Sequence, residues 1–338
     1  MREFALSLDA LPTHALSSTR HVTEGDEDGT VNHTLAATPQ TETPAAATRE
    51  PVDLSVIVPA RNAATTLSTQ LEALSGQTYD GVWEVVVVDN GSTDATVAVA
   101  LAWQRKIERL RVISAPWHAG AGHSRNVGAR ATRGRLVLCC DADDVVADGW
   151  ISAMVRALKV YDLVGGVVDR SQLNSASALA WRPGTGSDLL DGFTFMPYVS
   201  SACLGMRREM WHRVGGFDER FVGGDDVDLC WRVQLAGGRL GAAPDAVVHY
   251  RLRPTLTATM RQLYHYGRSH TQLYRQYRDL GMPPSTRTAY TPIDAWRRIR
   301  TLVPRAIRSR SAFTTLCADV AFRAGRLTGS INNRVLYL

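Results

Sequence analysis

The stretch RLVLCCDADD, residues 135–144, predicts the fold of this chain most directly. It begins with an apolar run at residues 136–140 and ends in Asp141, Asp143 and Asp144. A short apolar run that stops at polar residues is typical of a strand buried on both faces of a parallel sheet. Carboxylates two positions apart at a strand end point to the same side, so they can bind one hard cation. The stretch predicts a buried strand that ends at a divalent-metal site.

Similar strands precede this one, with helical segments between them. The strand-like runs are LSVIVPA at 54–60, WEVVVVD at 83–89 and LRVIS at 110–114. Residues 63–75 place Leu67, Leu71 and Leu74 on one helical face, and a second helix is expected from about residue 122 to residue 132. Ser92 or Thr93 is expected to cap the helix that follows the second strand. Strands that alternate with helices at this pace predict an α/β fold with a doubly wound, mostly parallel sheet flanked by helices.

Polar side chains follow three of these strands directly. In doubly wound sheets, ligands bind just beyond the carboxyl ends of the strands. We therefore expect a binding site where these ends meet. The residues at the strand ends are Pro59, Arg61 and Asn62, then Asp89, Asn90 and Asp94, and then Asp141, Asp143 and Asp144.

The second half of the chain is less regular. Residues 170–200 contain several Gly, Pro and Asn and predict long loops, which often shape the pocket of a second substrate. A helix is expected within GGDDVDLCWRVQLAGG at 223–238, followed by a strand within AAPDAVVHY at 242–250. Helices rich in Arg, Tyr and Leu are expected from about residue 255 onward.

Five segments in this order resemble the motifs of the family-2 glycosyltransferases, which have the GT-A fold. They are LSVIVPARN at 54–62, VVVVDNGSTDAT at 85–96, HSRNVGARATRGRLVLCCDADD at 123–144, GGFDERFVGGDDVDLCWRV at 215–233 and VVHY at 247–250. The resemblance covers roughly residues 52–275. It implies an enzyme that transfers a sugar from a nucleotide diphosphate sugar to an acceptor, with uridine or deoxythymidine as the expected donor bases.

The resemblance also implies roles for individual donor-side residues. Asp89 would recognise the base or the ribose, Arg125 would approach the nucleotide, and Asp141 would lie near the ribose. Asp143 would be the principal ligand of Mg²⁺ or Mn²⁺, and His249 would be a second ligand or a diphosphate contact. A structural histidine after an apolar strand is the alternative for His249. The residues expected to bind the nucleotide sugar are Pro59, Arg61, Asn62, Asp89, Arg125 and Asp141.

On the acceptor side, the family's Glu-Asp pair appears as Asp225-Asp226. By position, Asp226 is the candidate general base, which would take the proton of the attacking hydroxyl in a single displacement with inversion. Asp225 stands where the family more commonly has Glu. Whether the shorter Asp225 side chain reaches the same partner as that Glu is left open. Both acids would also be favourable at a helix N-terminus. Gly224, after Gly223, would allow the backbone to approach the sugar closely.

Charge is distributed unevenly along the chain and suggests its organisation. Residues 1–50 carry 3 Arg against 8 acidic residues, whereas residues 285–338 carry 10 Arg against 2 Asp. We expect a disordered N-terminal extension at 1–51, a GT-A domain at 52–275 and a basic helical extension at 276–338. We expect the extension to pack on the domain, because its apolar residues would otherwise form a large exposed patch. Contact with an anionic membrane surface is the alternative.

Cysteines and apolar runs indicate the compartment. The five Cys residues show no CxxC spacing, so buried reduced thiols are expected rather than disulfides or a zinc site. A helix that spans a bilayer needs about 20 apolar residues, and no apolar run in the sequence is close to this length. We expect a cytoplasmic protein, with a peripheral contact at the inner membrane face if the tail binds lipid.

The processive synthase signature QxxRW is missing, which favours transfer of one sugar per encounter.

Other functions fit the sequence less well. A nucleotidyltransferase would normally carry a glycine-rich phosphate loop near the first strand, and VPARN lacks one. A nicotinamide-dependent dehydrogenase would need GxGxxG after the first strand. The nearest candidate, GAGHSRNVG at 120–128, follows the third strand and lacks the glycine at the sixth position. A degenerate transferase that serves as a sugar-binding or lipid-binding scaffold would be expected to lose its carboxylates, and here they are present. No nucleic-acid recognition module accompanies the basic tail. Cell-envelope lipids, polysaccharide precursors and small aglycones are all compatible acceptors.

Overall fold

An eight-stranded sheet organises the part of the chain described by the computed structural model, which comprises residues 51–179, 189–190, 193–284, 300, 303–304, 306 and 309–337. The strands are β1 (Leu54–Ala60), β2 (Trp83–Asp89), β3 (Leu110–Ser114), β4 (Leu136–Cys140), β5 (Val145–Val146), β6 (Leu163–Asp169), β7 (Cys203–Arg207) and β8 (Leu240–His249). Their order across the sheet is β3-β2-β1-β4-β7-β6-β8-β5. The expected N-terminal extension lies outside the described residues, apart from Pro51.

The sheet is mostly parallel, as predicted. β1 pairs in parallel with β2 and β4, β2 with β3, and β6 with β8. β7 runs antiparallel between β4 and β6, and the short β5 runs antiparallel to β8. The carboxyl ends of β1, β2 and β4 therefore meet at one edge, where ligands bind in sheets of this kind.

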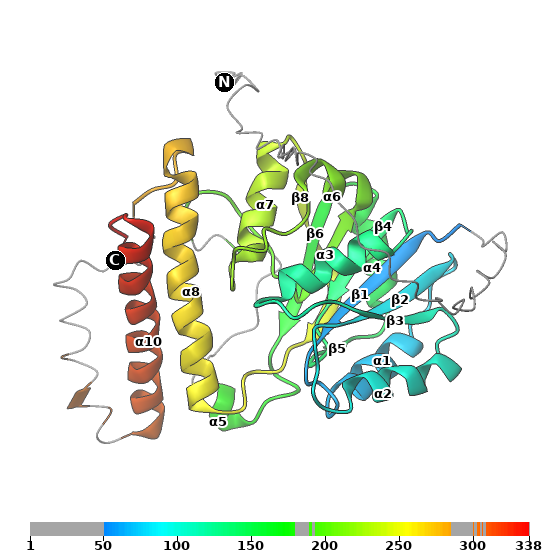
Figure 1. Ribbon diagram of the computed structural model, residues 1–338, viewed down its shortest axis with the longest axis horizontal. Helices are drawn as coiled ribbons and strands as arrows, with labels where there is room; N and C mark the ends of the chain where they lie inside the picture. Colours follow the sequence, from blue (N-terminus) through cyan, green and yellow to red (C-terminus); the bar gives the residue numbers. More distant parts are fainter. Residues whose placement is uncertain are drawn as a thin grey trace, which may run out of the picture. The chain divides into compact units, whose positions relative to one another are not determined.

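Helices cover both faces of this sheet (Figure 1). Alternate residues of a strand point to opposite faces, so Val85 and Val87 pack into one apolar cluster and Val86 and Val88 into the other. Leu67, Leu71 and Leu74 are fully buried in the first cluster, which confirms the predicted helical face. The helices around the first cluster are α1 (Leu67–Ser75), α2 (Thr96–Ala102) and α4 (Trp150–Leu158), and those around the second are α3 (Ala121–Ala131), α6 (Arg208–Val214), α7 (Asp225–Leu235) and α8 (Leu256–Tyr277).

Neither Ser92 nor Thr93 caps α2, whose N-cap residue is Ala95. Asp94, rather than Ser92 or Thr93, accepts a hydrogen bond from the backbone N–H of Thr96 at 3.0 Å. The Ser92 hydroxyl instead accepts a hydrogen bond from the backbone N–H of Asn62 at 3.0 Å. The loop after β2 is thus tied to the loop after β1, which positions both loops at the edge of the sheet. The shorter elements are α5 (Ala176–Leu179), η2 (Trp103–Arg105) and η3 (Arg278–Leu280).

Near the C-terminus, α10 (Arg310–Asn333) lies beside α8, and both helices run in the same direction (Figure 1). Two glycines allow a very close approach. A Cβ atom at Gly267 would lie 2.1 Å from the carbonyl oxygen of Phe322, and one at Gly325 would lie 2.1 Å from that of Tyr264. After the helix, Tyr337 is buried and stacks on Tyr274 with 4.7 Å between ring centroids. The described part of the tail thus packs on α8, while the division at 275/276 stays a prediction.

The cysteines are mostly buried, and the described helices are not suited to span a membrane. Cys139, Cys140, Cys203 and Cys230 are buried, as expected, and no disulfide joins any of the five cysteines among the described residues. No helix among the described residues combines the length and the apolar character required to cross a membrane.

Candidate active site

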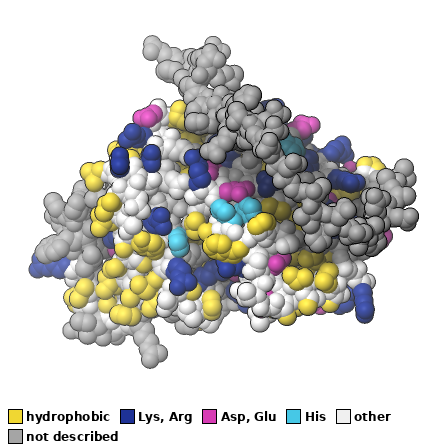
Figure 2. All heavy atoms as spheres, viewed as in Figure 1, with side chains coloured by type: hydrophobic (Ala, Val, Ile, Leu, Met, Phe, Trp, Pro, Cys, Tyr) yellow, Lys and Arg dark blue, Asp and Glu magenta, His cyan; other side chains and the backbone are white. Residues whose placement is uncertain are grey.

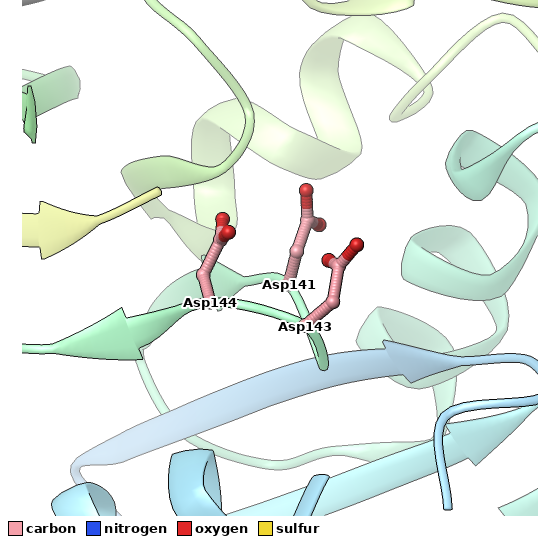
Figure 3. A group of neighbouring side chains, drawn as sticks. All are labelled: Asp141, Asp143 and Asp144. Atoms are coloured by element: carbon pink, nitrogen blue, oxygen red, sulfur yellow. The ribbon is translucent and has the colours of Figure 1, made fainter. Parts of the chain in front are cut away.

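The turn after β4 carries the acidic cluster that the sequence predicted. Asp141, Asp143 and Asp144 each offer a carboxylate oxygen, and these three atoms lie within 4.8 Å of one another. Figure 3 shows all three carboxyl groups on the same side of the turn. Oxygen ligands at this spacing suit a hard divalent cation. The turn therefore brings together residues that could hold Mg²⁺ or Mn²⁺.

Asp144 provides an independent test of this fit. One carboxylate oxygen of this buried residue accepts a hydrogen bond from the backbone N–H of Arg251 at 2.8 Å. The other oxygen is buried and has no hydrogen-bond partner. Burial, followed by the neighbouring charges of Asp141 and Asp143, raises the pKa of Asp144 well above its ordinary range. A buried, unpartnered carboxylate oxygen beside two other carboxylates fits a cation site.

Asp143 is less buried than Asp144. Its Oδ2 atom accepts a hydrogen bond from Arg253 at 2.9 Å. Burial and the charge of Asp141 raise the pKa of Asp143, and the Arg253 guanidinium opposes this shift. Sequence reasoning missed Arg253, because an arginine after a strand carries no signal that it will reach a turn 110 residues earlier.

Arg125 joins the acidic turn to the start of α7. α3 lies tightly on the sheet, because a Cβ atom at Gly128 would be only 2.6 Å from Ile57. This holds the Arg125 side chain, only 3% exposed, within 2.5 Å of Asp141 and 3.6 Å of Asp225. Burial alone would lower the pKa of Arg125, but Asp141 and Asp225 raise it. The sequence predicted a nucleotide contact for Arg125, and the structure places this residue between two carboxylates.

The other expected nucleotide residues lie at the ends of β1 and β2. Asn62 accepts a hydrogen bond from the backbone N–H of Thr93 at 2.8 Å. The carboxylate of Asp89 accepts from the backbone N–H of Ser92 at 3.2 and 3.3 Å. Arg61 lies over the ring of Trp117 with 5.0 Å to the centroid. These contacts hold the two loops together, and the roles of Pro59, Arg61, Asn62 and Asp89 toward a nucleotide stay predictions.

Trp117, in the loop after β3, is a second residue that sequence reasoning missed. Its side chain is 57% exposed, which is unusual for so large an aromatic residue. Asn90 holds the loop through two hydrogen bonds of 2.9 Å with the backbone of His118. The only signal in the sequence was a tryptophan just beyond a strand end.

Two glycines turn the chain into α7. Gly223 and Gly224 have φ values of +97° and +73°, a region that residues with a Cβ atom rarely adopt. α7 then begins at Asp225, and Asp226 accepts a hydrogen bond from the backbone N–H of Ser201 at 3.2 Å. The segment before this turn is held by Asn126 on α3, which bonds the backbone of Phe217 in both directions. α3 thereby positions both Arg125 and the start of α7.

The adjacent acids at the start of α7 have perturbed protonation. Burial and the charge of Asp226 raise the pKa of Asp225 to about 7, against the opposing charge of Arg125. Burial also raises the pKa of Asp226. Neighbouring carboxyls with raised pKa values are suited to accept a proton during a reaction.

The raised pKa of Asp225 predicts how stability changes with pH. Between pH 4 and pH 7 the folded protein holds a proton at Asp225 that the unfolded chain has released, so the free energy of unfolding falls as pH rises through this range. We expect Asp225→Asn to reduce this fall by at least about 1 kcal/mol. Urea unfolding at pH 5 and pH 8 in the presence of a chelator measures it. An equal fall in wild type and variant would contradict the assignment.

His249 ends β8 and is not a member of the group formed by the three carboxylates. Its Nδ1 atom lies 2.9 Å from Asp169 Oδ2, which orients the ring. A carboxylate on one ring nitrogen leaves the other nitrogen for a metal or phosphate. The structure brings His249 together with Asp169, and the metal role of His249 stays a prediction.

A cavity of about 430 Å³ lies between the acidic turn and the start of α7. Arg125, Asp141, Asp225 and Asp226 line one part of it, and Gly223 and Gly224 border it. Residues 170–200 contribute to the wall, as the sequence predicted for the described part of these loops. The cavity's aromatic and loop residues are Arg170, Leu190, Phe193, Tyr198, Tyr250, Tyr266 and His270. The arrangement places Asp141 of the acidic turn and the Asp225-Asp226 pair around one space that is large enough for part of a substrate.

Comparison with known protein families agrees with this geometry. The family model described as glycosyl transferase family 2 matches residues 55–215, and that of glycosyl transferase family group 2 matches residues 136–324. The chain belongs to the family 2 glycosyltransferases. As a member of this family it is a glycosyltransferase, an enzyme of class EC 2.4. Family membership favours this function over nucleotidyl transfer and over a degenerate scaffold.

Individual relatives are similar in sequence to part of this glycosyltransferase. Glycosyltransferase AglE of Haloferax volcanii is 29% identical over 213 residues, which are 60% of this chain and 67% of AglE. The pre-mycofactocin glycosyltransferase of Mycobacterium tuberculosis is 30% identical over 244 residues, 68% of this chain and 49% of the relative. The chain thus matches about half the length of the second relative.

Among solved structures, the mannosyltransferase PcManGT from Pyrobaculum calidifontis, in complex with GDP-Man and Mn²⁺, is similar to this glycosyltransferase. The TM-score is 0.50 at 22% sequence identity, over 83% of this chain and 77% of that protein. At this identity the likeness establishes a shared GT-A fold.

Proposed function

We propose that this glycosyltransferase moves one sugar from a nucleoside diphosphate sugar to an acceptor hydroxyl, with metal assistance and inversion at the anomeric carbon. The observation that carries the proposal is the position of Arg125, which contacts Asp141 of the acidic turn and Asp225 at the start of α7. Asp141 of the acidic turn and the acid pair also line the same cavity. A donor held at one and an acceptor held at the other would meet within it.

Asp141, Asp143 and Asp144 would hold the divalent metal. Such an ion, when bound, neutralises charge on the diphosphate as it leaves. The Mn²⁺ and GDP-Man in the PcManGT complex support a metal and a nucleotide sugar for this chain as well. Asp89, Asn62 and the loops that they tie together would bind the nucleoside end of the donor.

Asp226 would act as the general base. Its carboxylate would take the proton of the acceptor hydroxyl while the acceptor oxygen forms a bond to the anomeric carbon. The bond from the anomeric carbon to the diphosphate oxygen breaks at the same time, and the nucleoside diphosphate leaves with its electron pair. Attack from the opposite face inverts the anomeric configuration. Arg125 would hold Asp225 in place beside the base.

A thermal-shift experiment tests this proposal. We expect UDP or GDP with Mn²⁺ to raise Tm by about 5 °C at a concentration of about 100 Kd, because a ligand of the folded state stabilises it. Asp143→Asn should lose this shift. Asp148→Asn, an exposed acid a few residues further along, is the matched control and should keep it. No stabilisation of the wild type by any nucleoside diphosphate would contradict the proposed donor site.

Contact between the tail and a membrane also stays a prediction. Exposed hydrophobic residues on α10, between 46% and 69% accessible, lie on the side away from α8, and Figure 2 shows hydrophobic side chains gathered over this helix pair. Arg261, Arg268 and Arg275 are exposed at intervals of seven along α8 and complement anionic lipid. Sedimentation with anionic vesicles but not with neutral vesicles would support the contact. The exposed α10 residues are Phe313, Val320, Leu327 and Ile331.

A further inference from the structure

Arg253 lies where the acidic turn meets the cavity, and the proposed reaction assigns no role to it. It follows β8 in the short segment that leads into α8. Its guanidinium donates to Asp143 Oδ2 at 2.9 Å, and the Arg253 side chain is 41% exposed. Arg253 and Asp141 both line the cavity. The guanidinium therefore lies beside the carboxylates that would hold a metal and also borders the space that would hold the donor.

The backbone around Arg253 is fixed to the acidic turn. Arg251 donates from its backbone N–H to Asp144 at 2.8 Å and from its side chain to the carbonyl of Asp143 at 2.9 Å. The backbone N–H of Leu252 donates to Asn174 at 2.8 Å. These bonds hold the Cα atom of Arg253 close to the turn, while its half-exposed side chain can change rotamer.

The Arg253 guanidinium and a divalent metal would bind the same carboxylate. Like charges at short range repel, so a metal on Asp143 weakens the pair between Arg253 and Asp143. Arg125 differs in this respect, because it is buried between Asp141 and Asp225 and its departure would leave both carboxylates without a partner. Of these two arginines, Arg253 is the one that can move.

We propose that Arg253 neutralises Asp143 in the metal-free protein and moves to the donor diphosphate when a divalent metal binds the acidic turn. This inference rests on the proposed function. A guanidinium binds carboxylate and phosphate oxygens in the same two-pronged geometry, so both positions satisfy its donors. In the second position it stabilises the negative charge that develops on the departing nucleoside diphosphate.

Two titrations of wild type and Arg253→Met test the proposal. The first titrates Mn²⁺ without nucleotide, and the second titrates UDP or GDP at saturating Mn²⁺. Removal of the competing guanidinium should strengthen Mn²⁺ binding by about fivefold or more. Loss of a charged hydrogen-bond donor should weaken nucleoside diphosphate binding by about tenfold or more. The two affinities should therefore change in opposite directions.

Controls separate this role from a structural one. Arg253→Lys keeps the charge and should bring both affinities back toward wild type. Arg251→Met removes a side chain that only supports the turn, and should not strengthen Mn²⁺ binding. If Arg253→Met weakens the binding of both Mn²⁺ and the nucleoside diphosphate, or changes neither affinity, the proposal is overturned. A wild type that binds neither Mn²⁺ nor UDP or GDP overturns the proposed donor site itself, so the two failures are distinguishable.

Discussion

Asp226→Asn should lower kcat by about a thousandfold, because an amide cannot accept the proton of the attacking hydroxyl. Donor binding should remain within about threefold of wild type, since the hydrogen bond from the backbone of Ser201 can still be accepted by the amide oxygen. The measurement is release of nucleoside diphosphate from the donor sugar, together with donor affinity in the presence of Mn²⁺. A selective loss of kcat identifies a group that acts in the reaction and not in binding.

Asp225→Asn is the matched control, since the two acids are adjacent and both border the cavity. We expect a smaller loss of kcat, about tenfold, because Asp225 acts through its contact with Arg125. If Asp225→Asn proves the more damaging change and Asp226→Asn keeps over a tenth of wild-type turnover, the general base is Asp225. The raised pKa of Asp226 adds a further expectation: turnover should fall as pH drops, as this carboxylate takes up a proton.

Gly325→Ala should lower the free energy of unfolding by about 2–3 kcal/mol, although helix propensity alone predicts a gain of about 1 kcal/mol. The new Cβ atom would lie 2.1 Å from the carbonyl oxygen of Tyr264 and 2.9 Å from its carbonyl carbon. Both are backbone atoms, so the clash is relieved only if α8 and α10 separate. Urea unfolding followed by circular dichroism gives the free energy.

Ala324→Gly is the control for propensity in the same turn of α10. Ala324 is exposed, so this change should cost only about 1 kcal/mol. A stabilised Gly325→Ala variant would show that α10 does not pack on α8 as closely as the structure describes.

Local patterns in the sequence predicted most of the sheet and one of its helices accurately. Val85–Val88 alternate between the two faces of the sheet, and Leu67, Leu71 and Leu74 share one buried face of α1. Both results follow from backbone geometry, since side chains repeat every two residues in a strand and every 3.6 in a helix. Ser92 and Thr93 do not cap α2, because both contact Asn62 in the loop after β1, and Asp94 bonds the first residue of the helix instead.

The candidate site was predictable only in part. Asp141 and Asp143 were found because they follow a strand directly and are two positions apart. Arg253 was missed because its contact with Asp143 joins residues 110 apart, and no local pattern records such a contact. Asp144 was a third acid in the motif, and only its burial and its unpartnered oxygen indicate a role in cation binding.

By itself, the sequence of this glycosyltransferase determined the alternation of β1 to β4 with helices, the acidic turn after β4 and the acid pair that begins α7, whereas α4 and β5 to β7 were not predicted. These features depend on residues close together in the chain, where backbone geometry relates spacing to direction. Only the tertiary structure decided that Arg125 joins Asp141 to Asp225, that Arg253 pairs with Asp143, and that Gly267 and Gly325 bring α8 and α10 together. These contacts arise from packing between distant segments, so they depend on how the whole domain buries its apolar surface.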